Sequence, residues 1–412
     1  MSSEVGAVTV TTGNPTFRDA LRVREFRWLW IADTQSALGD QLTRVAISVL
    51  VFSRTGSAAL TALVFGMTYL PAVLGGLFLS GLADRYPRRR LMVICDAARF
   101  VLVLAVAIPS LADSAIIVCV AIEAAMSSLF TTAELSEIPE MLPAEVFPAA
   151  SALRTISNQL SQVAGFAVGG VVVAVVGPRT GLAVDAASFL LSAAIIQSRT
   201  RLRHHPSTKA GNERANLLTA SMQGARAVLG DPRLRVLAGL VWLTASLTMR
   251  EGIAVPYAVA EQGGDVAVGM LLAAVPTGLA VGTFLSTRWL TKVQRLAWMC
   301  PAAIAVGLVT VPCGLTSNPS VSVALWVLAG ALASYVVVAM AEFTVSVPGR
   351  VRGAAVGFAA SILIALQGAA IAGAGLISES IGAHRTVALS GGVGAAIGIW
   401  LAIRWARLTV ST

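Results

Sequence analysis

Apolar runs of about 20 residues, separated by short polar stretches, recur along the whole chain. A helix of that length crosses the roughly 30 Å hydrocarbon core of a bilayer. A backbone surrounded by lipid must satisfy its own hydrogen bonds, so each apolar run is predicted to be a membrane-spanning α-helix. The pattern predicts twelve spans, at about residues 28–52, 58–82, 91–111, 114–136, 150–176, 181–198, 234–258, 266–287, 295–315, 320–344, 353–377 and 385–404.

Composition supports a lipid environment and excludes several other classes. Hydrophobic residues make up 56% of the 412 residues and charged residues 12%, and the mean hydropathy is +0.79. A water-soluble domain could not bury that much apolar surface. The net charge of +9 does not indicate a nucleic-acid partner, because the basic residues lie in short loops between apolar runs. The four cysteines fall inside predicted spans without metal-ligand spacing, so no metal or cofactor is expected.

The distribution of lysine and arginine predicts the orientation in the membrane. With twelve spans, one side of the membrane holds 24 of the 30 basic residues, and the opposite side holds Arg54, Arg179 and Arg385. Loops rich in lysine and arginine stay in the cytoplasm. Both termini are therefore predicted to be cytoplasmic, in a multi-pass protein of the cell membrane. Residues 1–27 have no apolar segment with a cleavage site and are read as a cytoplasmic tail.

The longest polar connection divides the chain into two halves of six spans. The predicted parts are a cytoplasmic tail (1–27), a six-helix bundle (28–198), a cytoplasmic linker (199–233), a second six-helix bundle (234–404) and a C-terminal tail (405–412). The second part of the linker could form an amphipathic helix on the inner membrane surface. Residues 175–184 and 380–389 are weakly similar and occupy equivalent places in the two halves, as parallel repeats would.

A basic turn follows the second predicted span, where Asp84 is followed by Arg85, Arg88, Arg89 and Arg90. The stretch LADRYPRRRLM (82–92) resembles the loop between the second and third spans of major facilitator superfamily transporters, with Ser80 and Pro87 at two positions where glycine is expected. The resemblance implies an all-α membrane protein, with twelve transmembrane helices in two pseudo-symmetric six-helix bundles, the major facilitator fold. It also implies a gating latch, in which Asp84 pairs with Arg88 and is joined by Glu134 or Glu137. The alternative is that these arginines only anchor the topology.

The first span and the stretch VDAASFLLSA around Asp185 resemble the branch of that family that contains macrolide-efflux and enterobactin-export proteins. Gly39 and Asp40 match a recurrent Gly-Asp pair in that branch. The resemblance implies export of a hydrophobic or amphiphilic small molecule, such as an antibiotic, a siderophore or a related metabolite.

Charged residues inside the spans are candidates for function, because each costs about 2.5–3.5 kcal/mol at the bilayer centre. Asp40 and Arg44 lie one turn apart and could pair, or Asp40 could face a cavity and release its partner when substrate or a proton arrives. Glu123 has no basic residue within four positions and is a candidate proton site, with a neutral packing role as the alternative. Arg250 and Glu251 are neighbours that point about 100° apart, so each is expected to meet another helix.

Uncharged polar residues in the spans could line a cavity or hydrogen-bond between helices. They are Gln35, Asn158, Gln159, Gln162 and Gln367. In the fifth span, Gly165, Gly169 and Gly170 form a small-residue surface for close helix approach. This stretch resembles the glycine- and proline-rich motif of facilitator-family antiporters, although Phe166 replaces the expected proline.

No Walker-type phosphate-binding loop occurs, so an ATP-driven pump is not expected unless another subunit supplies the loop. The energy source is predicted to be the proton gradient. The sequence therefore predicts proton-coupled export by alternating access, with a small molecule, protons and lipid as partners and a monomer as the working unit. Uptake of a metabolite or nutrient on the same fold is an alternative, and a substrate of fixed charge with its own ion partner in the cavity would favour it. A non-transporting membrane sensor is a remoter one. An enzyme is not expected, since the chain lacks a His-carboxylate cluster or a Ser-His set at usable spacing.

Overall fold

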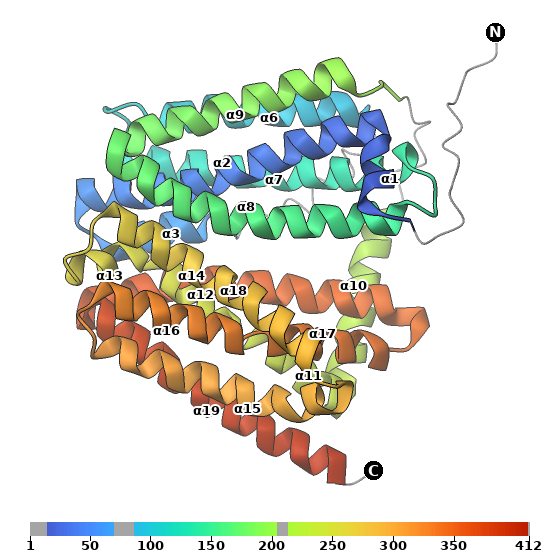
Figure 1. Cartoon of the computed structure of the whole chain (residues 1–412), viewed down its shortest axis with the longest axis vertical. Helices are drawn as coiled ribbons and strands as arrows, with labels where there is room; N and C mark the ends of the chain where they lie inside the picture. Colours follow the sequence, from blue (N-terminus) through green and yellow to red (C-terminus); the bar gives the residue numbers. More distant parts are fainter. Residues whose placement is uncertain (1–14, 70–85, 204–212, 411–412) are drawn as a thin grey trace.

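The computed structural model describes residues 15–69, 86–203 and 213–410, with side chains except at 213–221 and 409–410. Asp84, Arg85 and the second part of the second predicted span lie outside these ranges. All regular elements within them are helical. Figure 1 shows two stacked layers of helices, one from each half of the chain.

The first layer contains a short helix followed by the described helices of the first predicted bundle. Their bounds are α1 Phe17–Arg22, α2 Arg24–Thr55, α3 Ala58–Gly66, α6 Arg88–Val106, α7 Asp113–Met141, α8 Phe147–Val176 and α9 Pro178–Arg199.

The second layer begins in the predicted linker. Its elements are α10 Glu213–Gly230, α11 Pro232–Trp242, α12 Ala245–Gly252, α13 Ala254–Ala260, α14 Asp265–Trp289, α15 Lys292–Thr310, the 3-10 turn η1 Val311–Gly314, α16 Pro319–Leu332, α17 Tyr335–Ser346, the 3-10 turn η2 Gly349–Val351, α18 Arg352–Ile381 and α19 Ala383–Val410.

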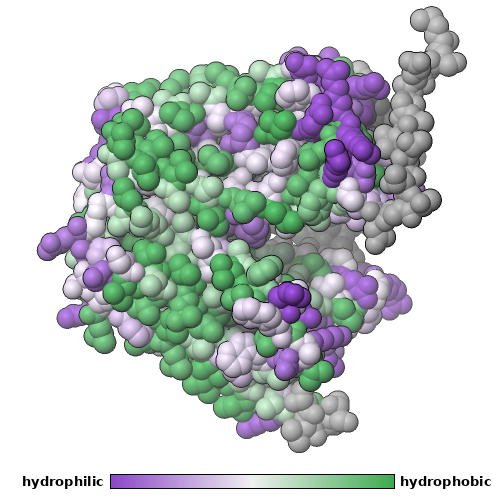
Figure 2. Space-filling model, in the orientation of Figure 1, coloured by the Kyte–Doolittle hydropathy of each residue, from purple (hydrophilic) through white to green (hydrophobic). Residues whose placement is uncertain are grey.

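Eight helices of the described ranges are long and apolar enough to cross a membrane, or nine if one bent pair is a single span. The helices α2 and α6 are also long enough, but they are more polar because they carry charged residues in their middles, among them Asp40 and Arg99. Exposed aliphatic and aromatic side chains such as Val175, Phe284 and Leu376 cover the outer surface, as Figure 2 shows. Such a surface suits contact with lipid.

The span predicted at 234–258 is not one continuous helix. It is divided into α11, α12 and α13, and the chain bends by 54° between the stretches 232–252 and 254–260. Pro256 has no N–H, and its ring would clash with the carbonyl of Gly252 in a regular helix. The break at Gly252 is therefore explained by a residue four positions further on.

Gly177 and Gly382 make equivalent turns in the two halves. Gly177 joins α8 to α9 with φ 80° and ψ 161°, and Gly382 joins α18 to α19 with φ 86° and ψ 157°. Only glycine adopts this backbone conformation without strain. The weak similarity between residues 175–184 and 380–389 thus corresponds to the same turn.

The two halves meet at the end of the molecule remote from α1 and α10, here called the far end. Two helix crossings join them there, α8 with α14 and α3 with α18. A Cβ atom at Gly269 would lie 2.6 Å from Gly170 Cα, and one at Gly375 would lie 2.5 Å from Ala62 Cβ. The Glu379 carboxylate at the end of α18 also accepts a hydrogen bond from the Ala59 backbone at 3.2 Å. Small residues therefore let helices of opposite halves touch closely.

The opposite end, here called the linker end, holds α1, α10 and the end of α19 (Figure 1). The space-filling view shows a hollow between the halves on this side (Figure 2). The helix α10 packs against the first turn of α18, where a Cβ at Gly224 would lie 2.3 Å from the Ala354 carbonyl oxygen. Val228 of α10 is fully buried in the core of the second half. The linker helix thus belongs to the second half.

Candidate functional site

A central cavity of about 730 Å³ lies between the halves. Its walls come from α2, α6, α7 and α8 on one side and from α12, α14, α17 and α18 on the other. This volume is in the range of sites that hold drug-sized ligands. The cavity is the candidate binding site.

Seven of the residues predicted as candidates from the sequence line this cavity. They are Asp40, Arg44, Asn158, Gln159, Gln162, Glu251 and Gln367. Gln35 is not among the lining residues, and its amide donates a hydrogen bond to the Ser188 carbonyl oxygen of α9 at 2.9 Å. Of the two roles expected for Gln35, lining a cavity or hydrogen-bonding between helices, the structure shows the hydrogen bond between helices.

A buried arginine, Arg99 of α6, holds three carboxyl groups together. Its guanidinium donates to Asp40 at 2.5 Å and to Glu123 at 2.9 Å, and lies 3.7 Å from Asp96. The guanidinium carbon is 4.0 Å from the centre of the Phe189 ring. Arg99 itself is only 2% exposed, whereas Asp40 is 26% exposed and reaches the cavity.

This arrangement corrects two interpretations of the sequence. Asp40 pairs with Arg99 and not with Arg44, and Glu123 is not an unpaired acid. Both interpretations considered only neighbours within one helix, whereas Arg99 belongs to α6 and its partners to α2 and α7. Glu123 lines a smaller chamber of about 50 Å³ that adjoins the central cavity, since Asp40 and Arg44 line both.

A second pair of charges lies nearer the linker end. Arg154 of α8 donates two hydrogen bonds to the Glu134 carboxylate, at 2.9 and 2.5 Å, and approaches Asp33 within 3.5 Å. Asp33 and Arg154 line the central cavity. Of the two acids expected to join Arg88, Glu137 lies near it, at 3.7 Å, whereas both oxygens of Glu134 are bound by Arg154 on the neighbouring helix.

Arg44 and Glu251 face each other across the cavity around Tyr69. The Tyr69 hydroxyl donates to Glu251 at 2.9 Å and so connects α12 of the second half to the segment after α3. The Arg44 guanidinium lies 5.4 Å from the Tyr69 ring centre and donates to Gln41 at 3.3 Å. Within the described residues, neither Arg44 nor Glu251 forms an ion pair.

Arg250 points away from the cavity into the second half. It is fully buried, with its guanidinium carbon 5.1 Å from the Trp326 ring centre and a nitrogen 3.5 Å from the Thr310 hydroxyl. Arg250 therefore meets other helices, as expected, but it is not a cavity residue, although as a charged residue inside a span it was a candidate for proton coupling there. The cause is the angle between helical neighbours, since Glu251 takes the direction that faces the cavity.

Gly39 makes room for a buried carboxyl beside Asp40. A Cβ at Gly39 would lie 2.0 Å from an Asp185 carboxyl oxygen. Asp185 accepts hydrogen bonds from Thr43 at 2.5 Å and from Ser188 at 2.9 Å. The three glycines of the fifth span act similarly. Gly165 and Gly169 approach α2 (a Cβ at Gly165 would lie 2.6 Å from the Leu38 carbonyl oxygen), whereas Gly170 meets α14 of the other half.

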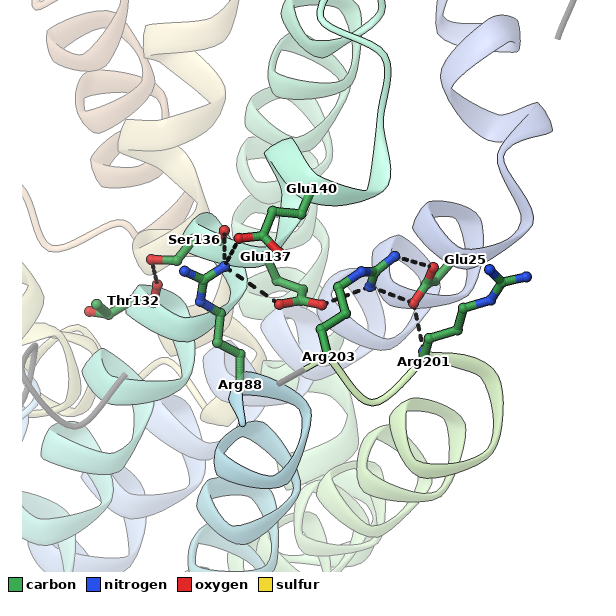
Figure 3. A network of polar contacts seen from close by, with 8 residues as sticks. All are labelled: Glu25, Arg88, Thr132, Ser136, Glu137, Glu140, Arg201 and Arg203. Atoms are coloured by element: carbon green, nitrogen blue, oxygen red, sulfur yellow. Dashed lines mark hydrogen bonds and ion pairs between the residues drawn. The ribbon is translucent and has the colours of Figure 1, made fainter. Parts of the chain in front are cut away.

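A network of ion pairs at the linker end joins α2, α6, α7 and the segment after α9 (Figure 3). Arg88 lies 2.6 Å from Glu140 and 3.7 Å from Glu137, and Arg203 binds Glu137 and Glu25, both at 2.8 Å. The hydrogen bond to Glu25 is the main cause of a raised pKa of the Arg203 guanidinium.

This linker-end network contains one contact of the predicted latch, the approach of Arg88 to Glu137. Arg89 donates to the Gln197 carbonyl oxygen, and Asp84 and Arg85 lie outside the described residues. Arg352 at the start of α18 donates to the Val347 carbonyl oxygen at 3.3 Å. The described part of the network therefore includes no helix of the second half. Sequence reasoning missed Glu25, Glu140 and Arg203 as members of this network. Arg203 follows α9 and is far from Glu25 and Glu137 in the sequence, so the sequence alone does not indicate these contacts.

Comparison with known proteins identifies the family. The sequence model of the Major Facilitator Superfamily matches residues 29–363. The chain belongs to the Major Facilitator Superfamily. As a member of this superfamily, it is a membrane transporter for a small molecule, with the superfamily's helical fold, and not an enzyme.

Two curated superfamily members illustrate its relatives. The chain is 28% identical over 292 residues to the multidrug efflux pump Tap of Mycobacterium tuberculosis, covering 67% of this chain and 68% of Tap. It is 27% identical over 295 residues to the enterobactin exporter EntS of Escherichia coli, covering 69% of each chain.

Solved structures of the superfamily share the fold. A bacterial homologue of the human lysosomal transporter Spinster, in an inward-facing and occupied conformation, superimposes with a TM-score of 0.74 at 14% identity, covering 92% of this chain and 97% of that one. Its inward-facing and unoccupied form gives 0.70 at 16% identity, covering 96% and 99%.

Proposed function

We propose that this superfamily member exports hydrophobic or amphiphilic small molecules in exchange for protons, by alternating access. The observation that carries the proposal is the central cavity, which lies between the halves and has the Arg99 and Arg154 charge clusters in one wall. Among the described residues, the halves contact each other at the far end, and a hollow lies between them at the linker end (Figure 2). With the orientation predicted from the basic residues, this is the state that receives substrate from the cytoplasm.

An excess of carboxyl groups in the first half supports proton coupling. The described spans of that half place six carboxyl groups near three guanidinium groups; the acids are Asp33, Asp40, Asp96, Glu123, Glu134 and Asp185. Unpaired charges are costly inside a membrane, so an excess of acids over arginines is what a proton-exchanging site would need. Asp40 reaches the cavity and Glu123 a chamber with room for a few water molecules.

Arg99 offers a mechanism for the exchange. It holds Asp40 and Glu123 through two different nitrogens, so a proton on either acid removes one of its two short ion pairs. The guanidinium then binds the remaining carboxylate more strongly, and α2, α6 and α7 lose a constraint on their packing. A proton would thus favour one arrangement of these helices over the other.

The walls of the cavity support an amphiphilic substrate. The second half contributes mainly apolar side chains, Leu247, Val275, Pro276, Leu279, Val336 and Leu363, whereas the first half contributes mainly polar and charged ones. A molecule with an apolar face and hydrogen-bonding groups would match both walls. Tap and EntS, whose names describe export, agree with this direction of transport.

Uptake of a charged metabolite is the second candidate. Arg44 and Glu251 favour it, because both face the cavity without an oppositely charged partner among the residues of known position. A substrate with a fixed charge could pair with one of them.

The test is accumulation of fluorescent drugs and metabolites in cells that lack their own exporters, with and without a protonophore. We expect lower accumulation in cells that produce the protein, and loss of the difference when the protonophore is added or Glu123 is replaced by Gln. Asp113→Asn is the matched control, since Asp113 pairs with Arg54 at the far end. Export that continues unchanged with the protonophore would exclude proton coupling, and accumulation above that of empty cells would favour uptake.

A further inference from the structure

A second hollow, of about 270 Å³, lies between α11 and α19 near the linker end. It shares no lining residue with the central cavity. Its wall carries three arginines, Arg235 of α11 and Arg404 and Arg407 of α19, and no acidic residue. Arg404 and Arg407 are three positions apart, so they project from the same side of α19. The groove concentrates positive charge where two helices meet.

The arginines of the groove differ from the neighbouring Arg233 in their ion pairs. Arg233, two residues before Arg235, lies 2.6 Å from the Glu342 carboxylate. In contrast, Arg235 and Arg404 are exposed and form no ion pair with any residue whose position is described. The Arg404 guanidinium carbon lies 5.2 Å from the Trp400 ring centre, which holds it at the edge of the groove. These two guanidinium groups are available to an anion.

The same groove also has an apolar part. Val236 and Leu401 form its floor and are almost fully buried, whereas Trp400 is 55% exposed. Next to it, Ile399 and Ile403 are exposed on the outer surface of α19. An exposed tryptophan beside arginines is typical of the depth at which headgroups meet acyl chains. The groove therefore has arginines that could bind an anionic headgroup and, next to them, an apolar surface that could contact an acyl chain.

We propose that this groove binds an anionic phospholipid of the leaflet at the linker end. Its phosphate would lie among Arg235, Arg404 and Arg407, whose guanidinium groups match phosphate oxygens in geometry, and an acyl chain would follow Trp400 and Leu401. Basic pockets between helices on the cytoplasmic side suit such headgroups. The lipid would join α11, which follows the linker helix, to the last helix of the chain. The proposal is independent of the transported substrate and of proton coupling.

Native mass spectrometry of the full-length protein in mild detergent tests the proposal, with phosphatidylglycerol or phosphatidylcholine titrated onto delipidated protein. The test variant is R235Q/R404Q/R407Q. The matched control is R288Q/K292Q/R295Q, which removes the same charge from the turn between α14 and α15 at the same end. Each basic residue near an anionic headgroup contributes about a fivefold factor in affinity. We expect the test variant to bind phosphatidylglycerol at least about tenfold more weakly than the wild type, and the control to bind like the wild type.

Three outcomes would overturn the proposal. They are equal affinity of the test variant and the wild type for phosphatidylglycerol, equal affinity of the wild type for the two lipids, and displacement of the lipid by millimolar inorganic phosphate, which would indicate a site for free anions. If the triple variant does not fold, Arg404→Gln and Arg235→Gln alone are measured, each with about a fivefold loss expected. An unchanged affinity in both single variants would count equally against the lipid.

Discussion

The contact between Gly170 and Gly269 predicts a way to open the far end. These residues lie on α8 and α14, in opposite halves, and a Cβ at Gly269 would lie 2.6 Å from Gly170 Cα and 2.6 Å from the Phe166 carbonyl oxygen. Both are backbone atoms, which cannot rotate away. Gly269→Ala should therefore force the two halves apart at the far end.

The size of the effect follows from the overlap. Ordinary contacts begin at 3.4 Å, so 3.4 minus 2.6 leaves a displacement of about 0.8 Å for the helices to accommodate. Overpacking of this kind costs about 1–3 kcal/mol. The strain exists only while the far end is closed. The ratio of far-end-open to far-end-closed molecules should rise by about 5- to 150-fold.

Labelling of a cavity cysteine measures this ratio. Asn158→Cys is introduced into a variant without the four native cysteines, and intact cells are treated with a membrane-impermeant maleimide. The labelling rate should rise with Gly269→Ala and stay constant with Gly373→Ala, whose added methyl group meets no atom within 4 Å.

A second control separates gating from stability. Gly278→Ala would place its Cβ 2.0 Å from the Val327 carbonyl oxygen of the same half, so it should lower the melting temperature without raising the labelling rate. Equal labelling of Gly269→Ala and Gly373→Ala would show that the α8–α14 crossing does not hold the far end closed, and the reasoning would be wrong.

Three further predictions concern the charged groups. Arg99→Lys should lower proton-driven transport in proteoliposomes by about tenfold or more, because one ammonium group cannot replace the two nitrogens that bind Asp40 and Glu123; a normal rate would contradict the coupling role. Glu251→Gln keeps an acceptor for the Tyr69 hydroxyl but removes the charge, so binding of cationic amphiphiles should weaken about fivefold while neutral ligands bind as before. Arg203→Gln removes partly exposed ion pairs worth about 1 kcal/mol and should lower the melting temperature by about 2–4 °C, more than Arg201→Gln does.

The membrane class could be predicted from hydropathy because most of the long helices are apolar over a stretch long enough to cross a bilayer. The interruption of the seventh span could not be placed in the same way. Pro256 indicates a break, but whether a proline kinks a helix or ends it depends on the neighbouring helices, which here accept a 54° bend.

The ion pairs show where sequence reasoning ends. Spacing within one helix indicated Asp40 with Arg44, whereas the structure pairs Asp40 with a residue of α6. One signal was present, since Asp96 and Arg99 lie three positions apart inside a predicted span and both need a partner there. Which partner they find depends on how the helices pack, and a single sequence does not contain that information.

The two walls of the central cavity suggest that the two halves have different roles. The charged lining residues come mainly from the first half, and the lining residues of the second half are mainly apolar. Substitutions such as Leu279→Ala or Val336→Phe would then alter which molecules are accepted and leave the ionic machinery intact. A transporter with this arrangement can change its substrate specificity through substitutions in one half alone.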